Sequence, residues 1–148
     1  MKHFATAEFE FSVLAKRSGI DNTIPDNILP NVYHLVNNLL DPLREEFGLP
    51  ILVTSGYRCP RLNRIVNGVK DSQHLTGNAA DITASYRSGR IRLLNACLGA
   101  LIETNHDFDQ LIYYDEDLTG PAFLHVSLAL PGDKNRRQVL HKRSFIKY

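Results

Sequence analysis

Apolar residues at three- and four-residue spacing predict the longest helix of the chain, over residues 30–47. This spacing puts the side chains on one face of a helix, and the positions are Val32, Leu35, Val36, Leu39, Leu40 and Leu43. Pro30 suits a first helical turn, whereas Pro42 lacks a backbone donor inside the run. We therefore expect a kink, or a join between two helices, near Pro42. Gly48 is the expected end of the helix.

Three shorter helices are predicted from caps and spacing. Ser12 can cap a helix over 13–17, within an N-terminal arm that runs to about residue 25. A second short helix covers 61–66 and stops near Gly68. The third covers 90–104, and its expected inward residues are Ile91, Leu94, Cys97, Leu98 and Leu101.

Short apolar or alternating runs predict the strands. Their expected ranges are 51–54, 80–84, 110–114, 123–130 and 138–146. Helices come first and mostly antiparallel strands follow, which predicts an α+β fold with a small antiparallel sheet and flanking helices. The chain has 148 residues, a typical size for one domain. We expect that domain to cover 1–148, with a metal-site core at about 51–130.

Composition narrows the class of protein. The chain is 43% hydrophobic and 22% charged, with a formal net charge of +1, so it lacks the basic footprint of a nucleic-acid-binding domain. Basic residues nevertheless gather near the C-terminus, at Lys134, Arg136, Arg137, His141, Lys142, Arg143 and Lys147. Two interpretations of this cluster stay open: a solvated face or edge strand, and attraction to an anionic polymer or substrate.

The N-terminus and the cysteines bear on location. Glu8 and Glu10 interrupt the first apolar residues, so we expect no signal peptide and synthesis in the cytoplasm. No run has the length of a membrane span, and we expect no membrane insertion. Cys59 and Cys97 are the two cysteines, which allows one disulfide bond without implying it.

Two histidines and an aspartate form the candidate metal site. His74 and Asp81 lie on either side of a small-residue bend that contains Gly77. His125 alternates with Leu124 and Val126, so it faces away from them on its strand. Two imidazoles and one carboxylate are a common ligand set for a catalytic zinc ion, because a fourth position stays open for water. The same donors also suit cobalt or manganese.

A wider set of motifs resembles the M15 family of zinc peptidases. The matching segments are Thr54-Ser55-Gly56-Tyr57-Arg58, Leu62-Asn63, Val66-Asn67-Gly68, the run from Ser72 to Asp81, Asp109-Gln110-Leu111-Ile112 and His125-Val126. The family includes D-alanyl-D-alanine carboxypeptidases and L-alanyl-D-glutamate endopeptidases that phages use as endolysins. Its small single-domain branch is the most similar. The resemblance implies the α+β fold shared with the Hedgehog signalling domain, and one zinc ion per chain.

The resemblance also implies roles for individual residues. The metal ligands would be His74, Asp81 and His125. Arg58 matches an arginine that lies over the substrate, where a guanidinium can hold a carboxylate or stabilise an oxyanion; a structural salt bridge is the alternative. Ser72 would orient His74, bind substrate or cap a turn, and Gln110 would line the cleft.

The general base departs from the family pattern. Many relatives carry an acid three residues before the second histidine, or a glutamate at the end of the Asp-Gln-Leu-Ile strand. Here those positions hold Ala122 and Tyr114. A zinc hydrolase needs a group that accepts a proton from water. The remaining candidates are the acids of the following loop, Asp115, Glu116 and Asp117, with His106 as a further one; solvated loop charges are the alternative interpretation.

Three functions stay open at this point. The first is a zinc peptidase that cleaves peptidoglycan stem peptides, with Arg58 on the oxyanion and Asp115 or Glu116 as proton shuttle. Without a signal peptide, it would be a phage or prophage endolysin released by holin-type partners, or an enzyme for imported muropeptides. The second is a catalytically impaired zinc module that binds a wall peptide or a protein partner. The third is a metal-free phage structural component.

Overall fold

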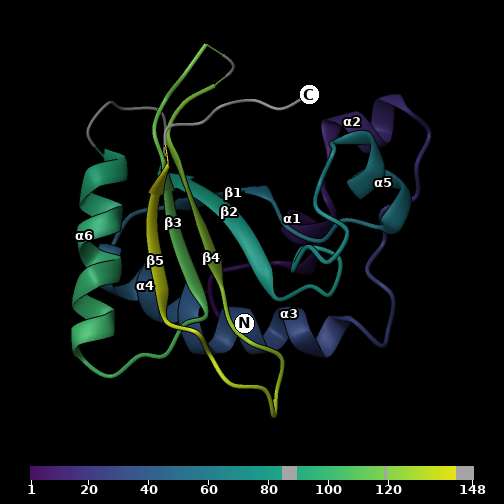
Figure 1. The fold of residues 1–148 in the computed structure, drawn as a ribbon. Coiled ribbons are helices and arrows are strands. Elements are labelled where there is room, and N and C mark those ends of the chain that lie inside the picture. The colour runs from purple at the N-terminus through teal and green to yellow at the C-terminus, as the bar shows by residue number, and fades with distance from the viewer. Residues whose placement is uncertain (85–89, 119, 143–148) are drawn as a thin grey trace.

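A computed structural model of the chain describes residues 1–84, 90–118 and 120–142. Within them, five strands form one sheet in the order β1-β2-β4-β3-β5 (Figure 1). The strands are β1 (Ile51–Ser55), β2 (Ala79–Ala84), β3 (Gln110–Tyr114), β4 (Phe123–Ser127) and β5 (Gln138–Lys142). The predicted α+β class is therefore confirmed.

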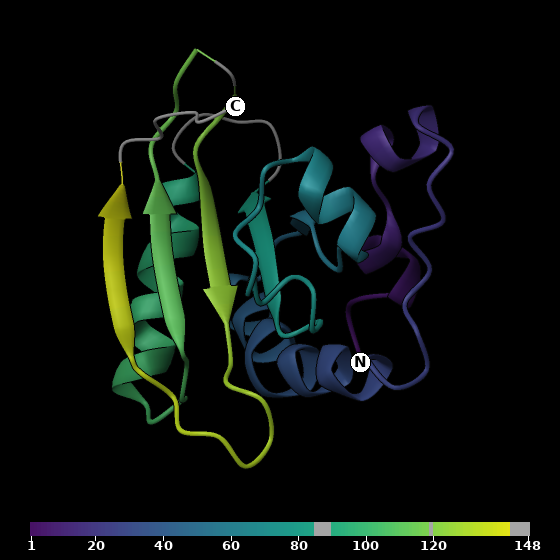
Figure 2. The same ribbon diagram turned by 45° about the vertical axis from the view of Figure 1, so that its right-hand side comes forward.

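The helices cover one face and one end of the sheet. They are α1 (Thr6–Glu10), α2 (Val13–Arg17), α3 (Leu29–Leu35), α4 (Asp41–Phe47), α5 (Pro60–Ile65) and α6 (Arg90–Glu103). Helix α6 lies behind β3 and β5, while α1, α2 and α5 gather beyond β1 (Figure 2). None of the helices in the described ranges has the length and hydrophobicity needed to cross a membrane.

The long helical segment is interrupted where its proline predicts. Between α3 and α4 lies a π-helical turn, η1 (Val36–Leu40), in which the amide of Asp41 donates to the carbonyl of Val36. Pro42 has no amide hydrogen and its ring would crowd the preceding turn, so the wider turn accommodates it. The predicted apolar stripe is buried along the whole segment, including Val32, Leu35, Val36, Leu39, Leu40 and Leu43.

One face of the sheet packs on the hydrophobic core, and the opposite face carries the candidate metal ligands of β2 and β4. Ala80 and Ile82 of β2 and Leu124 and Val126 of β4 point into the hydrophobic core with α3, α4 and α6. Since side chains alternate along a strand, the residues between them point to the opposite face. That face carries Asp81 and His125, as the alternation around His125 predicts.

Some strand predictions were wrong at their ends. β4 stops at Ser127 rather than residue 130, because the amide of Leu128 donates to the carbonyl of Asn78 and that of Ala129 to the side chain of Asn135. β5 pairs in parallel with β3, whereas the other pairings are antiparallel. The predicted continuation of the last strand to residue 146 lies outside the described residues. Helix α1 was not predicted.

Candidate metal centre and its cleft

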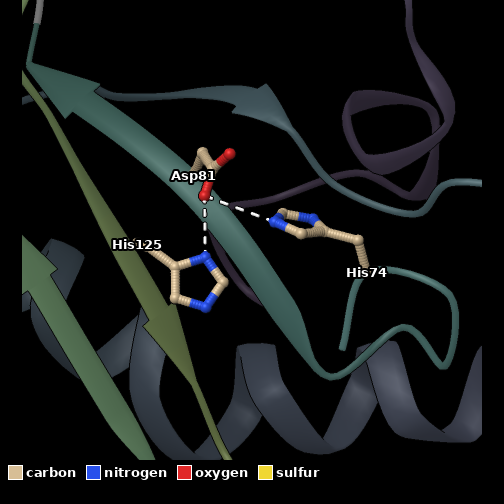
Figure 3. Close-up of side chains that lie close together, drawn as sticks. All are labelled: His74, Asp81 and His125. Atoms are coloured by element: carbon tan, nitrogen blue, oxygen red, sulfur yellow. Dashed lines mark hydrogen bonds and ion pairs between the residues drawn. The ribbon is translucent and has the colours of Figure 1, made fainter. Parts of the chain in front are cut away.

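Three segments bring the candidate ligands together (Figure 3). Asp81 on β2 and His125 on β4 are direct cross-strand partners. His74 comes from the loop between α5 and β2, and Gly77 turns that loop with a φ of 72°. A Cβ at Gly77 would lie 2.8 Å from Ile28 and 2.9 Å from Val32. Glycine therefore lets the loop pack against α3 and return to the sheet.

A backbone carbonyl fixes the orientation of the His74 ring. His74 is buried, and its Nδ1 lies 2.7 Å from the carbonyl oxygen of Gly56. A carbonyl only accepts hydrogen bonds, so Nδ1 carries a hydrogen and Nε2 is the ring nitrogen that can bind a metal ion. Nε2 points to Asp81, 3.3 Å from Oδ1. Carbonyl contacts of this kind commonly orient histidines that ligate metals.

Asp81 is held as a carboxylate between the two rings. Its Oδ1 lies 2.9 Å from Nδ1 of His125. Burial raises the pKa of the Asp81 carboxyl, but the charge and hydrogen bonds of His74 and His125 outweigh burial and leave that pKa well below its usual range. Asp81 is therefore ionised near neutral pH, as a metal ligand must be.

The spacing of the donor atoms fits one metal ion. His74, Asp81 and His125 each offer a ligand atom, and these atoms lie within 4.8 Å of one another. Bonds of about 2.0–2.2 Å in tetrahedral geometry put neighbouring ligand atoms about 3.3 Å apart. The 3.3 Å separation of His74 Nε2 from Asp81 Oδ1 matches this, and the His125 contact is slightly shorter. Two imidazoles and a carboxylate also suit zinc chemically.

The triad sits in a cleft of about 710 Å³ on the open face of the sheet. The cleft is lined by Arg58, Val66, Val69, Asp71, Ser72, Gln73, His74, Asp81, Gln110, Ile112, Tyr114, Phe123, His125, Arg136 and Lys142. The predicted substrate-binding residues Arg58, Ser72 and Gln110 all belong to this lining. The structure therefore brings them together with the candidate metal ligands.

Arg58 extends over the triad from the segment after β1. Its Nη2 lies 3.6 Å from Asp81 Oδ2, while Nε donates to the hydroxyl of Ser55 and Nη1 to the side chain of Asn63. Burial lowers the pKa of the guanidinium, and the nearby Asp81 carboxylate opposes that shift. The side chain is thus fixed on two sides with its charge next to the metal site.

Ser72 and Gln110 have local partners. The hydroxyl of Ser72 accepts from the amide of His74 at 3.3 Å, so Ser72 shapes the turn that carries this ligand. The side chain of Gln110 donates to that of Gln138 at 2.6 Å. This bond ties the start of β3 to the start of β5 at one end of the cleft.

The acids proposed as proton shuttle are not among the residues that line this cleft. Asp115 accepts a hydrogen bond from His141 at 2.9 Å, and both line a separate cavity of about 730 Å³ next to α6. Tyr114 lines the cleft of the candidate metal site, so alternation along the chain turns Asp115 to the other side. Glu116 is exposed, and Asp117 pairs with Gly120. His106 bonds to the carbonyl of Leu101 at the end of α6.

Tyr114 lines the cleft at the position where the family resemblance led us to expect an acid. Its ring stacks on Phe123 with centroids 4.6 Å apart. Burial raises the pKa of its hydroxyl, and Asp81 adds to the increase while Arg58 opposes it. Among the described acids, the cleft is lined by Asp71 and Asp81.

Sequence reasoning missed the groups that support the site. The carbonyl of Gly56 was not foreseen, since its role depends on a tertiary contact. Asp109 and Arg136 also escaped assignment, although Asp109 opens the Asp-Gln-Leu-Ile segment and Arg136 belongs to the basic cluster.

Comparison with known families gives one match. The model of the family described as Peptidase M15 matches residues 2–114. This span includes Arg58, His74 and Asp81, and it ends before His125. No curated relative matches the chain.

Proposed function

The chain belongs to the peptidase M15 family, and on that basis we propose that it is a zinc-dependent peptidase that cleaves peptidoglycan stem peptides. The observation that carries this proposal is the donor geometry of His74, Asp81 and His125, whose ligand atoms lie within 4.8 Å of one another. His74 would bind through Nε2, because Gly56 occupies Nδ1. Asp81 and His125 would complete the ligand set.

The residues around the triad support hydrolysis of an amide. A bound zinc ion supplies a Lewis acid that polarises the scissile carbonyl and activates water. The guanidinium of Arg58 stands next to Asp81 and can stabilise negative charge on the carbonyl oxygen. The hydroxyl of Tyr114 is a second donor on the same cleft, on the β3 side. Both side chains are held by neighbours, so they need little reorganisation.

A second function is favoured by the acids of the cleft. A non-catalytic zinc module would bind a wall peptide or a protein partner without cleaving it. Of the described acids lining the cleft, Asp81 is a proposed ligand and Asp71 is exposed. Asp115, which the sequence suggested as proton shuttle, pairs with His141 on the other face. A binding module needs no proton acceptor, so this placement of the acids is compatible with binding without cleavage.

Digestion of purified peptidoglycan distinguishes the two functions. The zinc-loaded protein is incubated with the polymer and the fragments are read by mass spectrometry, with His125→Ala as the matched variant. We expect new amino-terminal D-glutamate or D-isoglutamine ends, or released D-alanine, from the wild type only. The zinc content, measured by atomic emission, should be about one ion per chain in the wild type and lower in His125→Ala. A wild type that holds zinc and produces no fragments would support the binding module instead.

A further inference from the structure

Arg136 projects into the cleft from the segment before β5 and is held in place by a buried acid. Its Nε lies 3.1 Å from both carboxylate oxygens of Asp109, its Nη2 lies 2.6 Å from Oδ2, and its amide donates to Oδ1 at 2.7 Å. The Asp109 side chain is 4% exposed, whereas that of Arg136 is 55% exposed. The arginine is therefore anchored on one side and open to the cleft on the other.

The free part of the guanidinium is a ready anion site. Among the described residues, Nη1 of Arg136 has no hydrogen-bond partner, and Nη2 keeps one hydrogen after its bond to Asp109. An arginine presents its donors in a flat fork that matches a carboxylate. Because Asp109 fixes the fork in advance, little side-chain entropy is lost when an anion binds.

The anchor is connected to the metal site. Gln73 donates to Asp109 Oδ2 at 2.8 Å, and the next residue along the chain is the candidate ligand His74. The amide of Asp109 donates to the carbonyl of Ser127 at the end of β4, two residues beyond His125. Arg136 is thus fixed relative to both histidines.

The strand register gives the position of Arg136 along the cleft. His125 on β4 pairs with Ile112 on β3. Gln110 at the start of β3 pairs with Gln138, which follows Arg136 by two residues. Gln110 and Ile112 are about 7 Å apart along β3, and Arg136 comes two residues before Gln138, so Arg136 lies beyond the level of His125, at the Gln110 end of the cleft. The strands that carry these residues, β4, β3 and β5, run side by side in Figure 2. Lys142, paired with Tyr114, stands at the opposite end.

The charges of the cleft favour an acidic peptide. Its described cations are Arg58, Arg136 and Lys142, and its described acids are Asp71 and Asp81. Asp81 is a proposed metal ligand, and Asp71 is exposed. The hydrogen bond to Asp109 raises the pKa of the Arg136 guanidinium, burial opposes this shift, and the charges of Asp109 and Asp71 add to it. A bound divalent ion would add to the positive charge.

We propose that Arg136 binds a carboxylate of the peptide substrate on the Gln110 side of the metal centre and so selects acidic peptides. This inference rests on the proposed function, since it names the substrate that the same cleft would accept. In a stem peptide the carboxylate has two sources, the glutamyl residue and the free C-terminus.

Three synthetic peptides separate these sources. The first is L-alanyl-γ-D-glutamyl-L-lysyl-D-alanyl-D-alanine, the second carries D-isoglutamine in place of D-glutamate, and the third carries a C-terminal amide. KM and kcat are measured with the zinc-loaded full chain, and binding is measured by calorimetry after zinc removal with EDTA. The variant is Arg136→Gln, which keeps a donor for Asp109. Arg137→Gln is the matched control, because Arg137 pairs with the exposed Asp107.

The wild type should prefer the first peptide to one of the two amides by about tenfold, mainly in KM. Arg136→Gln should lose this preference with kcat little changed, and Arg137→Gln should keep it. The amide that weakens binding identifies the carboxylate. Equal affinity of the wild type for all three peptides, or a preference retained in Arg136→Gln, overturns the inference. If the wild type cleaves none of them, the proposed function fails, and the calorimetric preference still decides the role of Arg136.

Discussion

Arg58 illustrates how a single side chain can be both structural and chemical. Ser55 and Asn63 hold its guanidinium through hydrogen bonds, and its own amide donates to the carbonyl of His74. The ion pair between Arg58 and Asp81 is long, at 3.6 Å, so the guanidinium can still interact with a second negative group. The alternative that Arg58 is only a salt bridge and the proposal that it stabilises an oxyanion therefore predict different effects of substitution.

The substitution Arg58→Lys separates these roles. Lysine keeps the positive charge next to Asp81 but loses the planar fork, so zinc binding should persist. We expect kcat on a cleaved stem peptide to fall by about 10²–10³-fold, as when an oxyanion donor is removed. Arg61→Lys, on the exposed side of α5, is the matched control. A normal kcat in Arg58→Lys would argue for a purely structural ion pair.

Individual metal-ligating side chains can be predicted from the sequence more readily than the groups that orient them. His74, Asp81 and His125 could be singled out because their types and the strand alternation around His125 point to a metal. The carbonyl of Gly56 carries no such signal, because every residue has one and only the tertiary fold brings it within 2.7 Å of His74. The position of Arg136 in the cleft could not be predicted for a similar reason, since Asp109, which holds its guanidinium, lies 27 positions away in the sequence.

The connection between β1 and α5 is the element that supports the metal site. It passes close to α1, where the amide of Tyr57 donates to the carbonyl of Phe9 at 2.8 Å. A Cβ at Gly56 would lie 2.6 Å from the Cα of Phe9, closer than packing permits. Glycine is therefore required here by space, and the carbonyl that orients His74 depends on this close approach.

Replacing Gly56 with alanine should weaken metal binding without touching a ligand. The connection must move away from α1, which shifts the carbonyl that fixes the His74 ring. We expect zinc affinity to fall by about 10–100-fold and overpacking to cost about 1–3 kcal/mol of stability. Chelator competition and urea unfolding measure these effects. Gly99→Ala is the control, because its Cβ would meet no atom within 4 Å; zinc affinity equal to wild type in Gly56→Ala would contradict the argument.

Element types followed from periodicity more reliably than their ends and pairing did. Pro42 predicts an interruption, but the choice of a π-helical turn depends on how α3 and α4 both pack on the core. The parallel pairing of β5 with β3 depends on the path of the chain from Ser127 to Gln138. Asn78 donates to the carbonyl of Leu128, and Asn135 donates to the carboxylate of Asp107. These long-range hydrogen bonds hold the path in place, and no local sequence pattern reveals them.

For the whole molecule, Asp109 is a junction between distant segments. Its carboxylate binds Gln73 and Arg136, while its carbonyl accepts from the amide of Gln138. Hydrogen bonds from Arg136 lower the pKa of the Asp109 carboxyl, and they outweigh the opposing effect of burial. The ionised form of this one group thus links the ligand loop, the strand β3 and the approach to β5.

Because the pKa of Asp109 is lowered in the folded protein, ionisation of this carboxyl increases the free energy of unfolding. The unfolded carboxyl titrates near 3.9, so ionised Asp109 stabilises the fold above about pH 5, and this contribution is lost as pH falls toward the lower folded pKa. Asp109→Asn removes the charge and should cost about 1.5–3 kcal/mol at pH 7. The difference from wild type should shrink between pH 5 and pH 3, as measured by urea unfolding. Asp133→Asn, an exposed turn residue, should show little effect at either pH. A difference that stays constant with pH would mean that Asp109 acts through shape rather than charge, and that Arg136 is not anchored by an ion pair.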